Sequence, residues 1–231
     1  MPRPRGQAAP RPRPDQQRAL CDIGDGLAVS KRGQVHRARG TGKTLIGRWA
    51  AQQQDAKLAA VFLPSLHLVA QTLAEWRRPG GWPLTALVVC SDPTTVAGIA
   101  ERRHGDPGAA AATWRTNRVP VTTDPGEVAA FLASPGRKVL FGTYHSAPVI
   151  AAALRPAGAR LDLAVLDEAH NLAGYPSPAF RAVLDDGRIP ASRRLVLTAT
   201  QVLAGPAAHG LPDGGHSRPA LSMSTTDVTG R

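Results

Sequence analysis

Short apolar runs alternate along the chain with stretches in which apolar residues recur every three or four positions. The short runs predict strands at 34–36, 59–63, 84–89, 138–142, 161–166 and 194–197. The periodic stretches predict helices at 15–27, 43–54, 66–76, 127–133, 146–154 and 178–184. Strands that alternate with helices are typical of an α/β domain, in which helices cover both faces of a mostly parallel sheet. The pattern therefore predicts this fold class.

Three segments lack this alternation. Residues 1–14 are rich in Pro and Arg, and we expect them to be disordered or extended. Residues 91–126 are rich in Pro, Gly, Arg and Ala, and we expect a surface excursion. Residues 204–231 hold many Gly, Pro, Ser and Thr, and we expect a poorly ordered tail. The sequence therefore predicts one domain over 15–203, since 231 residues are too few for two full domains of this kind.

Composition adds a buried core and a strong positive charge to this picture. Apolar residues make up 42% of the chain and aromatic residues 4%, so the core must be built mainly from Ala, Val and Leu. The formal net charge of +11 indicates a polyanionic partner, most simply nucleic acid. However, the chain has only four lysines beside abundant Arg, Ala, Gly and Pro, which also fits a GC-rich coding sequence. Charge alone leaves both interpretations open.

The chain shows no sign of a secreted or membrane protein. Cys21 and Cys90 are far apart and have no metal-ligand spacing, which fits a reducing compartment. The N-terminus has no apolar signal region, and no apolar run approaches the length of a membrane span. We therefore expect a soluble, cytoplasmic protein with no membrane partner.

The segment RGTGKT at 39–44, the phosphate loop, follows a strand candidate and opens a helix. Glycines let such a loop fold so that its backbone N–H groups face phosphate oxygens, and the helix N-terminus adds a partial positive charge. Lys43 would hold the β- and γ-phosphates, and Thr44 would offer its hydroxyl to Mg²⁺. Arg37 occupies the position of the motif's first glycine, and the alternative interpretation is a Gly-rich turn that precedes Lys-Thr by chance. The predicted cofactor-binding residues here are Gly40, Thr41, Gly42, Lys43 and Thr44.

A second motif, Asp-Glu-Ala-His at 167–170, directly follows the strand at 161–166. Asp167 is placed to bind Mg²⁺ through water, and Glu168 to act as a general base on the attacking water. An acidic pair alone is more often a helix cap. A third motif, Thr-Ala-Thr at 198–200, follows the next strand. Because all three motifs stand at the carboxyl ends of strands, we expect them to meet in the crevice where α/β sheets bind ligands.

This ordered series resembles the first RecA-like domain of superfamily 2 DEAD/DEAH-box helicases, and is similar to that of type III restriction subunits. The resemblance covers roughly residues 13–203. It implies a RecA-like P-loop NTPase fold that uses ATP and Mg²⁺, with Lys43, Glu168 and His170 in catalytic roles. We therefore expect an ATP-binding domain of a nucleic-acid-dependent helicase or translocase, with DNA favoured over RNA as its partner.

Further segments match the family's motifs. The resemblance implies that Gln16, in the segment 13–20, reads adenine. It implies that Thr198 and Thr200 couple the nucleotide site to nucleic acid. It also implies contacts with the nucleic-acid backbone from Pro64, Ser65, Gln71, Thr143 and Tyr144. Pro at a strand end and polar residues that open a helix are also ordinary capping chemistry.

Only 31 residues follow Thr200, with no strand-helix alternation. We therefore expect the second RecA-like domain, which supplies an arginine finger in this family, to be absent or supplied by another chain. Without it, nucleotide binding should be weak and turnover small or absent. Two alternatives remain: a non-catalytic module that binds nucleic acid or a protein partner, and a small-molecule P-loop kinase, which has no need for the acidic and Thr-Ala-Thr motifs.

Overall fold

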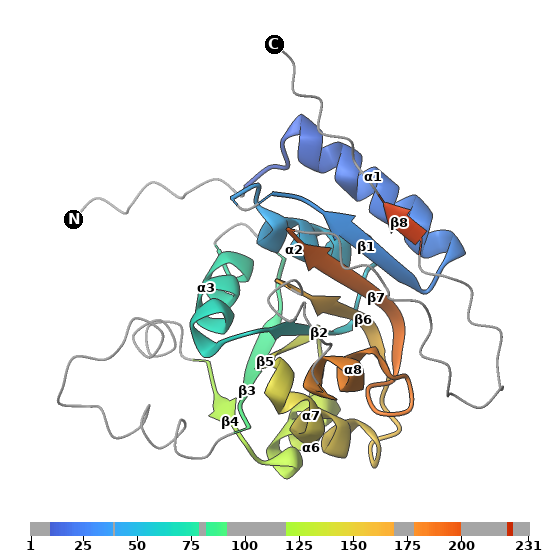
Figure 1. The fold of residues 1–231 in the computed structure, drawn as a ribbon. Coiled ribbons are helices and arrows are strands. Elements are labelled where there is room, and N and C mark those ends of the chain that lie inside the picture. Colours follow the sequence, from blue (N-terminus) through green and yellow to red (C-terminus); the bar gives the residue numbers. More distant parts are fainter. Residues whose placement is uncertain are drawn as a thin grey trace, which may run out of the picture.

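A computed structural model of the chain describes residues 10–38, 40–78, 82–91, 119–168, 178–199 and, for the backbone alone, 221–223. The described strands form one parallel sheet in the order β4-β3-β5-β2-β6-β7-β1-β8 (Figure 1). The strands are β1 (Arg32–His36), β2 (Leu58–Leu63), β3 (Thr85–Val89), β4 (Val121–Thr122), β5 (Lys138–Thr143), β6 (Leu161–Leu166), β7 (Ala191–Thr198) and β8 (Leu221–Met223).

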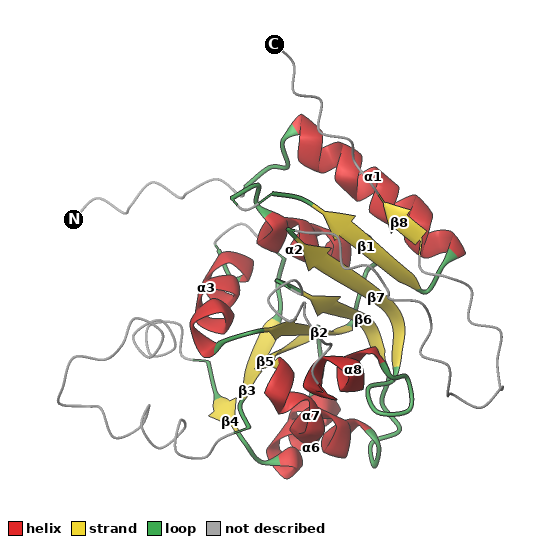
Figure 2. Ribbon diagram, in the orientation of Figure 1, coloured by secondary structure: helices red, strands yellow, loops and turns green. Residues whose placement is uncertain are grey.

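Helices cover both faces of the sheet (Figure 2). On one face, α1 (Pro14–Val29), α2 (Lys43–Gln53) and α3 (Leu66–Trp76) contribute to one apolar core. On the other face, α6 (Pro125–Ala133), α7 (Ala147–Leu154) and α8 (Pro178–Leu184) contribute to a second, and a 3-10 turn, η1 (Tyr144–Ser146), precedes α7. Residues of central strands are buried on both sides, which is why these strands read in the sequence as continuous apolar runs.

The strand order brings distant motifs to one edge of the sheet. Strand β7 lies between β1 and β6, with His36 opposite Thr198 and Leu166 opposite Val196. Because the three strands are parallel, their carboxyl ends share one edge. The segments that follow β1 and β6 are therefore neighbours in space, although more than a hundred residues separate them in the sequence.

The predicted α/β class with a mostly parallel sheet is confirmed. The helices at 66–76 and 178–184 and the strand at 161–166 have the predicted bounds. Two short strands were not predicted: β4 lies in the segment expected as a surface excursion, and β8 in the segment expected as a tail. Each is stabilised by pairing with a distant strand, which a local pattern does not reveal.

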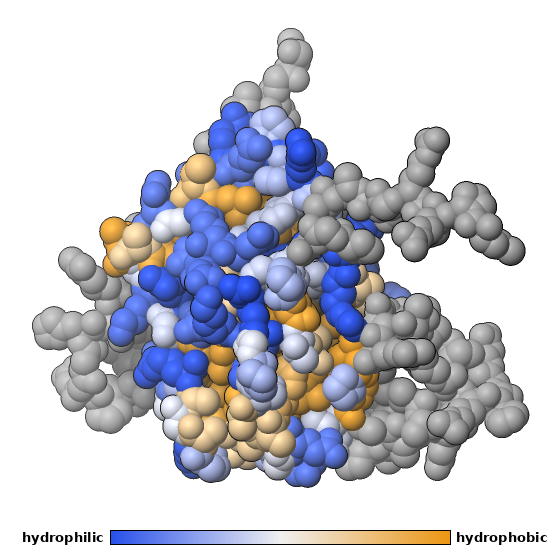
Figure 3. Space-filling view, turned by 180° about the vertical axis from the view of Figure 1, so that it is seen from behind, coloured by the Kyte–Doolittle hydropathy of each residue, from blue (hydrophilic) through white to orange (hydrophobic). Residues whose placement is uncertain are grey.

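Apolar residues reach parts of the surface seen in Figure 3, mainly over the lower half of that face. Within the described residues, the exposed large apolar residue is Val29, at 70%. None of the helices described there is both long and apolar enough to cross a membrane. The described residues contain one sheet, and thus one domain of this kind.

Candidate nucleotide-binding site

The phosphate loop connects β1 to the start of α2. Gly40 and Gly42 have φ of 78° and 80°, in the left-handed region that favours glycine. The carbonyl of Gly42 accepts hydrogen bonds from the N–H groups of Leu45 (3.1 Å) and Ile46 (3.2 Å), so the helix begins directly after the second glycine. The glycines of the motif are therefore required by the backbone.

Lys43 lies between the start of this loop and the acidic motif. Its side chain is 5% exposed, and Nζ donates to the carbonyl oxygens of Arg37 and Ala38, both at 3.3 Å. Nζ also lies 3.4 Å from Oε1 of Glu168. The structure thus places the lysine ammonium beside the acidic motif, close to where a phosphate on the loop would sit.

Thr44 and Asp167 form the second link between the two motifs. The Thr44 hydroxyl donates to Oδ2 of Asp167 at 3.4 Å. The Asp167 N–H donates to the carbonyl of Phe62 at 2.9 Å, which extends the strand ladder by one residue and holds the carboxylate at the sheet edge. Burial raises the pKa of Asp167 to about 6, and the nearby charge of Glu168 also raises it, while the Glu168 N–H, Lys43 and Thr44 act in the opposite direction.

Glu168 has a left-handed backbone with φ of 54°. Its N–H donates to Oδ1 of Asp167 at 2.8 Å, a contact that helps to hold this conformation. A left-handed conformation costs a non-glycine residue on the order of 1–3 kcal/mol, and such strain gathers at functional sites. The turn directs Glu168 into the same cavity as Lys43.

One cavity of about 590 Å³ unites these side chains. The convergence of the lysine and the two acids on one cavity agrees with the expectation from the sequence, while their chemical roles remain predictions. The cavity is lined by Gly40, Gly42, Lys43, Thr44, Leu45, Leu63, Leu68, Gln71, Thr72, Glu75, Arg78, Asp167 and Glu168.

The residues present fit a magnesium-bound nucleotide. Mg²⁺ prefers oxygen ligands and is usually bound by one or two protein oxygens together with water and substrate phosphates. The Thr44 hydroxyl and the Asp167 carboxylate supply two such oxygens side by side. Within the described residues, no group of three or more His, Cys, Asp or Glu side chains could hold a metal, so the phosphates would have to complete this site.

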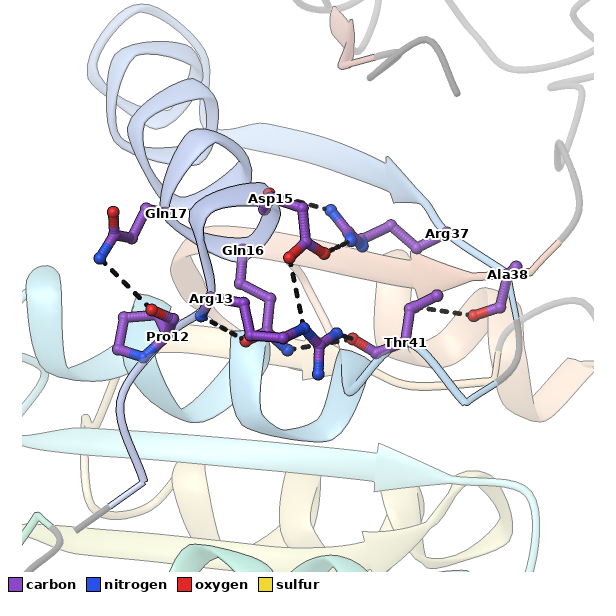
Figure 4. Close-up of polar contacts among 8 residues, drawn as sticks. All are labelled: Pro12, Arg13, Asp15, Gln16, Gln17, Arg37, Ala38 and Thr41. Atoms are coloured by element: carbon purple, nitrogen blue, oxygen red, sulfur yellow. Dashed lines mark hydrogen bonds and ion pairs between the residues drawn. The ribbon is translucent and has the colours of Figure 1, made fainter. Parts of the chain in front are cut away.

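Gln16 lies in the first turn of α1, and its side chain extends to Thr41 of the phosphate loop (Figure 4). Its side chain is 2% exposed and does not line the cavity. Nε2 donates to the Thr41 carbonyl at 3.0 Å, and Oε1 accepts from the Arg13 N–H at 2.9 Å. Both ends of the amide are therefore engaged within the chain, and the predicted reading of adenine would require Gln16 to exchange these partners.

The residues predicted to contact nucleic acid fall into two groups. Ser65 is exposed and caps α3 through the Leu68 N–H at 3.4 Å, Pro64 is half-buried beside it, and Gln71 is exposed and lines the cavity. By contrast, Thr143 and Tyr144 are buried. In this structure those two side chains meet other parts of the protein instead of a surface on which a strand could lie.

Tyr144 is buried next to the acidic motif and binds its backbone. Its hydroxyl donates to the Asp167 carbonyl at 3.0 Å, and its ring stacks on Phe62 and meets Phe180 edge-on. The Thr143 hydroxyl is hydrogen-bonded to that of Ser146 at 3.0 Å. Burial, with the charges of Asp167 and Glu168, raises the pKa of Tyr144, so the phenol keeps its proton. Tyr144 therefore has the geometry of a positioning residue.

Thr198 is fully buried at the end of β7, where its carbonyl accepts the Arg37 N–H at 3.0 Å. The structure thus connects the Thr-Ala-Thr motif to the start of the phosphate loop through the backbone. The other predicted coupling residue, Thr200, and the predicted catalytic residue His170 lie outside the described residues.

The sequence interpretation missed the contribution of α3 to the cavity. Thr72, Glu75 and Arg78 line it, and the Trp76 indole N–H donates to the Thr44 carbonyl at 3.0 Å. The spacing of Leu68, Thr72 and Glu75 at three or four positions places them on one helical face, and this signal could have identified the wall.

A parallel sheet with a phosphate loop after β1 and an acidic motif after β6, on either side of β7, is consistent with the first RecA-like domain of superfamily 2 helicases. Residues 9–202 match the family described as Type III restriction enzyme, res subunit, and the chain belongs to that family. No curated relative matches the chain at a significant level.

Two solved structures of Type ISP restriction-modification enzymes are similar to the chain. A nuclease-deletion mutant of LlaGI in complex with a DNA substrate mimic is 25% identical, with a TM-score of 0.65, over 83% of this chain and 18% of that one. The ATP-dependent enzyme LlaBIII bound to DNA is 23% identical, with a TM-score of 0.67, over 84% of this chain and 13% of that one. The chain therefore spans less than a fifth of the length of either enzyme.

Proposed function

We propose that this chain is the ATP-binding domain of a nucleic-acid-dependent ATPase of the helicase or translocase type. The observation that supports this most directly is the shared cavity of Lys43, Thr44, Asp167 and Glu168. The lysine and threonine contact the two acids across the cavity at 3.4 Å each. A cation, a hydroxyl and two carboxylates at a helix N-terminus form the set that phosphoryl transfer from a nucleoside triphosphate requires.

Each side chain has a distinct task in ATP hydrolysis. Lys43 would neutralise the β- and γ-phosphates, and Thr44 and Asp167 would hold Mg²⁺, which would supply further neutralisation of the phosphate oxygens. Glu168 accepts a proton from the attacking water, whose oxygen forms the new bond to the γ-phosphorus while the bond to the ADP oxygen breaks. Lys43 already contacts Glu168, so binding of a triphosphate would exchange that ion pair for phosphate contacts.

We further propose DNA as the polyanionic partner. The net charge of +11 favours nucleic acid, and the exposed Ser65 and half-buried Pro64 at the carboxyl edge of the sheet remain candidate contacts. The two similar enzymes were solved with DNA or a DNA mimic. The chain has two cysteines, Cys21 and Cys90, which are far apart and have no metal-ligand spacing, and we propose a reducing cytoplasm as its location.

Full turnover should need a second RecA-like domain. The described residues hold one such domain, so we propose that the second is contributed by another chain or by sequence beyond this one. An arginine finger contributed in trans raises the rate of related enzymes about 10³- to 10⁵-fold. We therefore expect this chain alone to bind MgATP weakly and to hydrolyse little or none.

The test measures binding of a fluorescent ATP analogue with Mg²⁺ by the chain and three variants. Lys43→Ala should weaken binding at least about tenfold, because it removes the charge that faces the phosphates. Glu168→Gln should retain binding and lose whatever hydrolysis the wild-type chain shows. Lys31→Ala, which removes an exposed lysine at the opposite end of β1, is the matched control and should bind as the wild type. Absence of binding, or equal binding by the Lys43→Ala variant, would contradict the proposal.

The high charge also favours a second candidate, a non-catalytic module that binds nucleic acid. Titration of single- and double-stranded DNA at two salt concentrations separates the two candidates when combined with the ATP measurement. DNA binding that weakens steeply with salt, without any effect of Lys43→Ala on nucleotide affinity, would support the module.

A further inference from the structure

Arg37 stands where β1 becomes the phosphate loop, and its backbone is fixed on two sides. Its N–H donates to the Thr198 carbonyl of β7 at 3.0 Å, and its own carbonyl accepts the Lys43 ammonium at 3.3 Å. A displacement of the Arg37 backbone would therefore move one of the oxygens that hold Lys43. The position of Arg37 thus bears on the geometry of the nucleotide site.

Asp15 holds the Arg37 side chain from the first turn of α1 (Figure 4). The guanidinium donates from Nη1 to the Asp15 carbonyl at 3.1 Å, and Nη2 forms an ion pair with the Asp15 carboxylate. The Arg37 side chain is 11% exposed, and its Nε is buried without a hydrogen-bond partner. Asp15 is therefore the group that compensates this largely buried cation, and it keeps the guanidinium outside the cavity.

The same turn of α1 also holds the far end of the loop. The Thr41 carbonyl accepts hydrogen bonds from Arg13 Nη2 at 2.9 Å and from Gln16 Nε2 at 3.0 Å. The Thr41 hydroxyl donates to the Ala38 carbonyl at 2.8 Å, which connects the two ends. Between them, a side chain at Gly40 would meet no atom within 4 Å. The loop is thus anchored at Ala38 and Thr41, and the position of Gly40 between them leaves space for a phosphate.

Asp15 remains charged in this setting. Burial acts to raise its pKa, but the hydrogen bond from Arg13 and the charge of Arg37 outweigh this and lower the pKa below the ordinary value. Arg13 Nε lies 3.3 Å from Oδ1 of Asp15. The Asp15 carboxylate therefore contacts both Arg37, at the start of the loop, and Arg13, which binds the Thr41 carbonyl.

We propose that Asp15 is a positioning residue for nucleotide binding, which acts through Arg37 to keep the phosphate loop and Lys43 in a binding-competent arrangement. The proposal rests on the proposed function, since it assigns Asp15 to the same nucleotide site. Loss of the carboxylate leaves a largely buried guanidinium without its anion, and such a group reorients toward solvent or toward other acceptors. The Arg37 backbone and the carbonyls around Lys43 then shift with it.

The test compares Asp15→Asn, Asp15→Arg/Arg37→Asp and Asp22→Asn. Asp22 is an exposed carboxylate on the same helix, so its replacement by Asn makes the same charge change away from the loop. With the fluorescent ATP analogue, we expect Asp15→Asn to bind about tenfold more weakly, the charge reversal to recover most of the affinity, and Asp22→Asn to bind as the wild type. Thermal unfolding of each variant verifies that the measured protein is folded.

A second readout does not depend on ATP. Hydrogen exchange of the backbone amides at 37–44, in nucleotide-free protein, should be faster in Asp15→Asn than in the wild type and unchanged in Asp22→Asn. Unchanged exchange in Asp15→Asn, or a charge reversal that binds as weakly as Asp15→Asn, would overturn the positioning role. If the wild-type chain binds no ATP but the loop exchange still depends on Asp15, the proposed function fails while the control of the loop by Asp15 stands.

Discussion

The Thr44 hydroxyl donates a hydrogen bond to the carboxylate of Asp167, a residue 123 positions further along the chain. The contact exists because β7 inserts between β1 and β6, so that the loop after β1 and the motif after β6 open at the same edge. A buried carboxylate with a pKa of about 6 beside a hydroxyl makes this pair sensitive to proton concentration. This sensitivity provides two tests of the site.

Binding of MgATP should strengthen as the pH rises from about 5 to about 7. A metal site needs Asp167 ionised, and below its pKa of about 6 each bound metal must displace a proton. Affinity should therefore change by up to about tenfold per pH unit below the pKa and level off above it. Isothermal titration with MgATP over this range measures the effect. In Asp167→Asn the affinity should be low, and its pH dependence over this range should be flatter.

Stability of the nucleotide-free protein should respond to pH in the opposite direction. The pKa of Asp167 is raised from 3.8 to about 6 in the folded chain, so its protonated form is favoured by folding. The stabilisation that protonated Asp167 contributes is complete below about pH 4 and disappears as the pH rises through about 6. The free energy of unfolding should therefore fall by on the order of 3 kcal/mol from this group. The free energy of unfolding of the wild type and of Asp167→Asn is measured with urea at about pH 4.5 and about pH 7. An identical pH dependence in the two proteins would refute the assignment.

Replacement of Gly42 by Ala should abolish nucleotide binding. The Gly42 backbone is left-handed, and an added Cβ would approach Nε2 of Gln16 to 2.6 Å. The side chain therefore pushes on the group that holds the Thr41 carbonyl, in addition to the conformational cost of about 1–2 kcal/mol. Binding of the ATP analogue and thermal unfolding measure the two effects separately.

Gly158→Ala is the matched control for that experiment. Gly158 also has a positive φ, of 55°, but a Cβ there would meet nothing within 4 Å. We expect a similar loss of stability from the backbone and no change in nucleotide affinity. If both variants bound the nucleotide equally well, the space that Gln16 leaves at Gly42 would have no part in the site.

Tyr144→Phe should lower the free energy of unfolding by about 1 kcal/mol. The substitution preserves the ring that packs on Phe62 and Phe180, but it removes the hydroxyl that donates to the Asp167 carbonyl. Chemical denaturation measures the change. A direct role in DNA contact would instead weaken DNA binding without a loss of stability, and this outcome would restore the interpretation drawn from the sequence.

Trp76 should report nucleotide binding through its fluorescence. Its indole N–H donates to the carbonyl of Thr44, within the first turn of α2, and its ring is buried against Phe141 and Trp82. A nucleotide that engages Thr44 would change the environment of this indole. We expect a change in emission on addition of MgATP that Trp76→Phe removes and Trp49→Phe preserves. A signal that survives in Trp76→Phe would assign the change to another tryptophan.

Local pattern predicted most helices and strands of the domain, because apolar periodicity reflects which side of an element is buried. It failed for β4 and β8, which are two and three residues long and depend on pairing with β3 and β1. Motif spacing predicted that Lys43 and Asp167 would share a cavity, since parallel strands present their carboxyl ends together. It did not predict that α3 lines the same cavity, since Gln71 was assigned to a nucleic-acid contact and Glu75 to no motif.

The sequence by itself determined the fold class and indicated which motifs meet at one edge of the sheet, because hydrophobic periodicity and the order of short motifs can be read from local sequence. Only the tertiary structure decided which residues from distant parts of the sequence contact one another. It placed Asp15 beside Arg37 and buried Tyr144 beneath Asp167 instead of leaving it on a nucleic-acid surface. Such contacts depend on how α1 and η1 pack against the loops at the sheet edge. Packing of this kind joins residues far apart in the sequence, and neither residue carries a local signal of its partner.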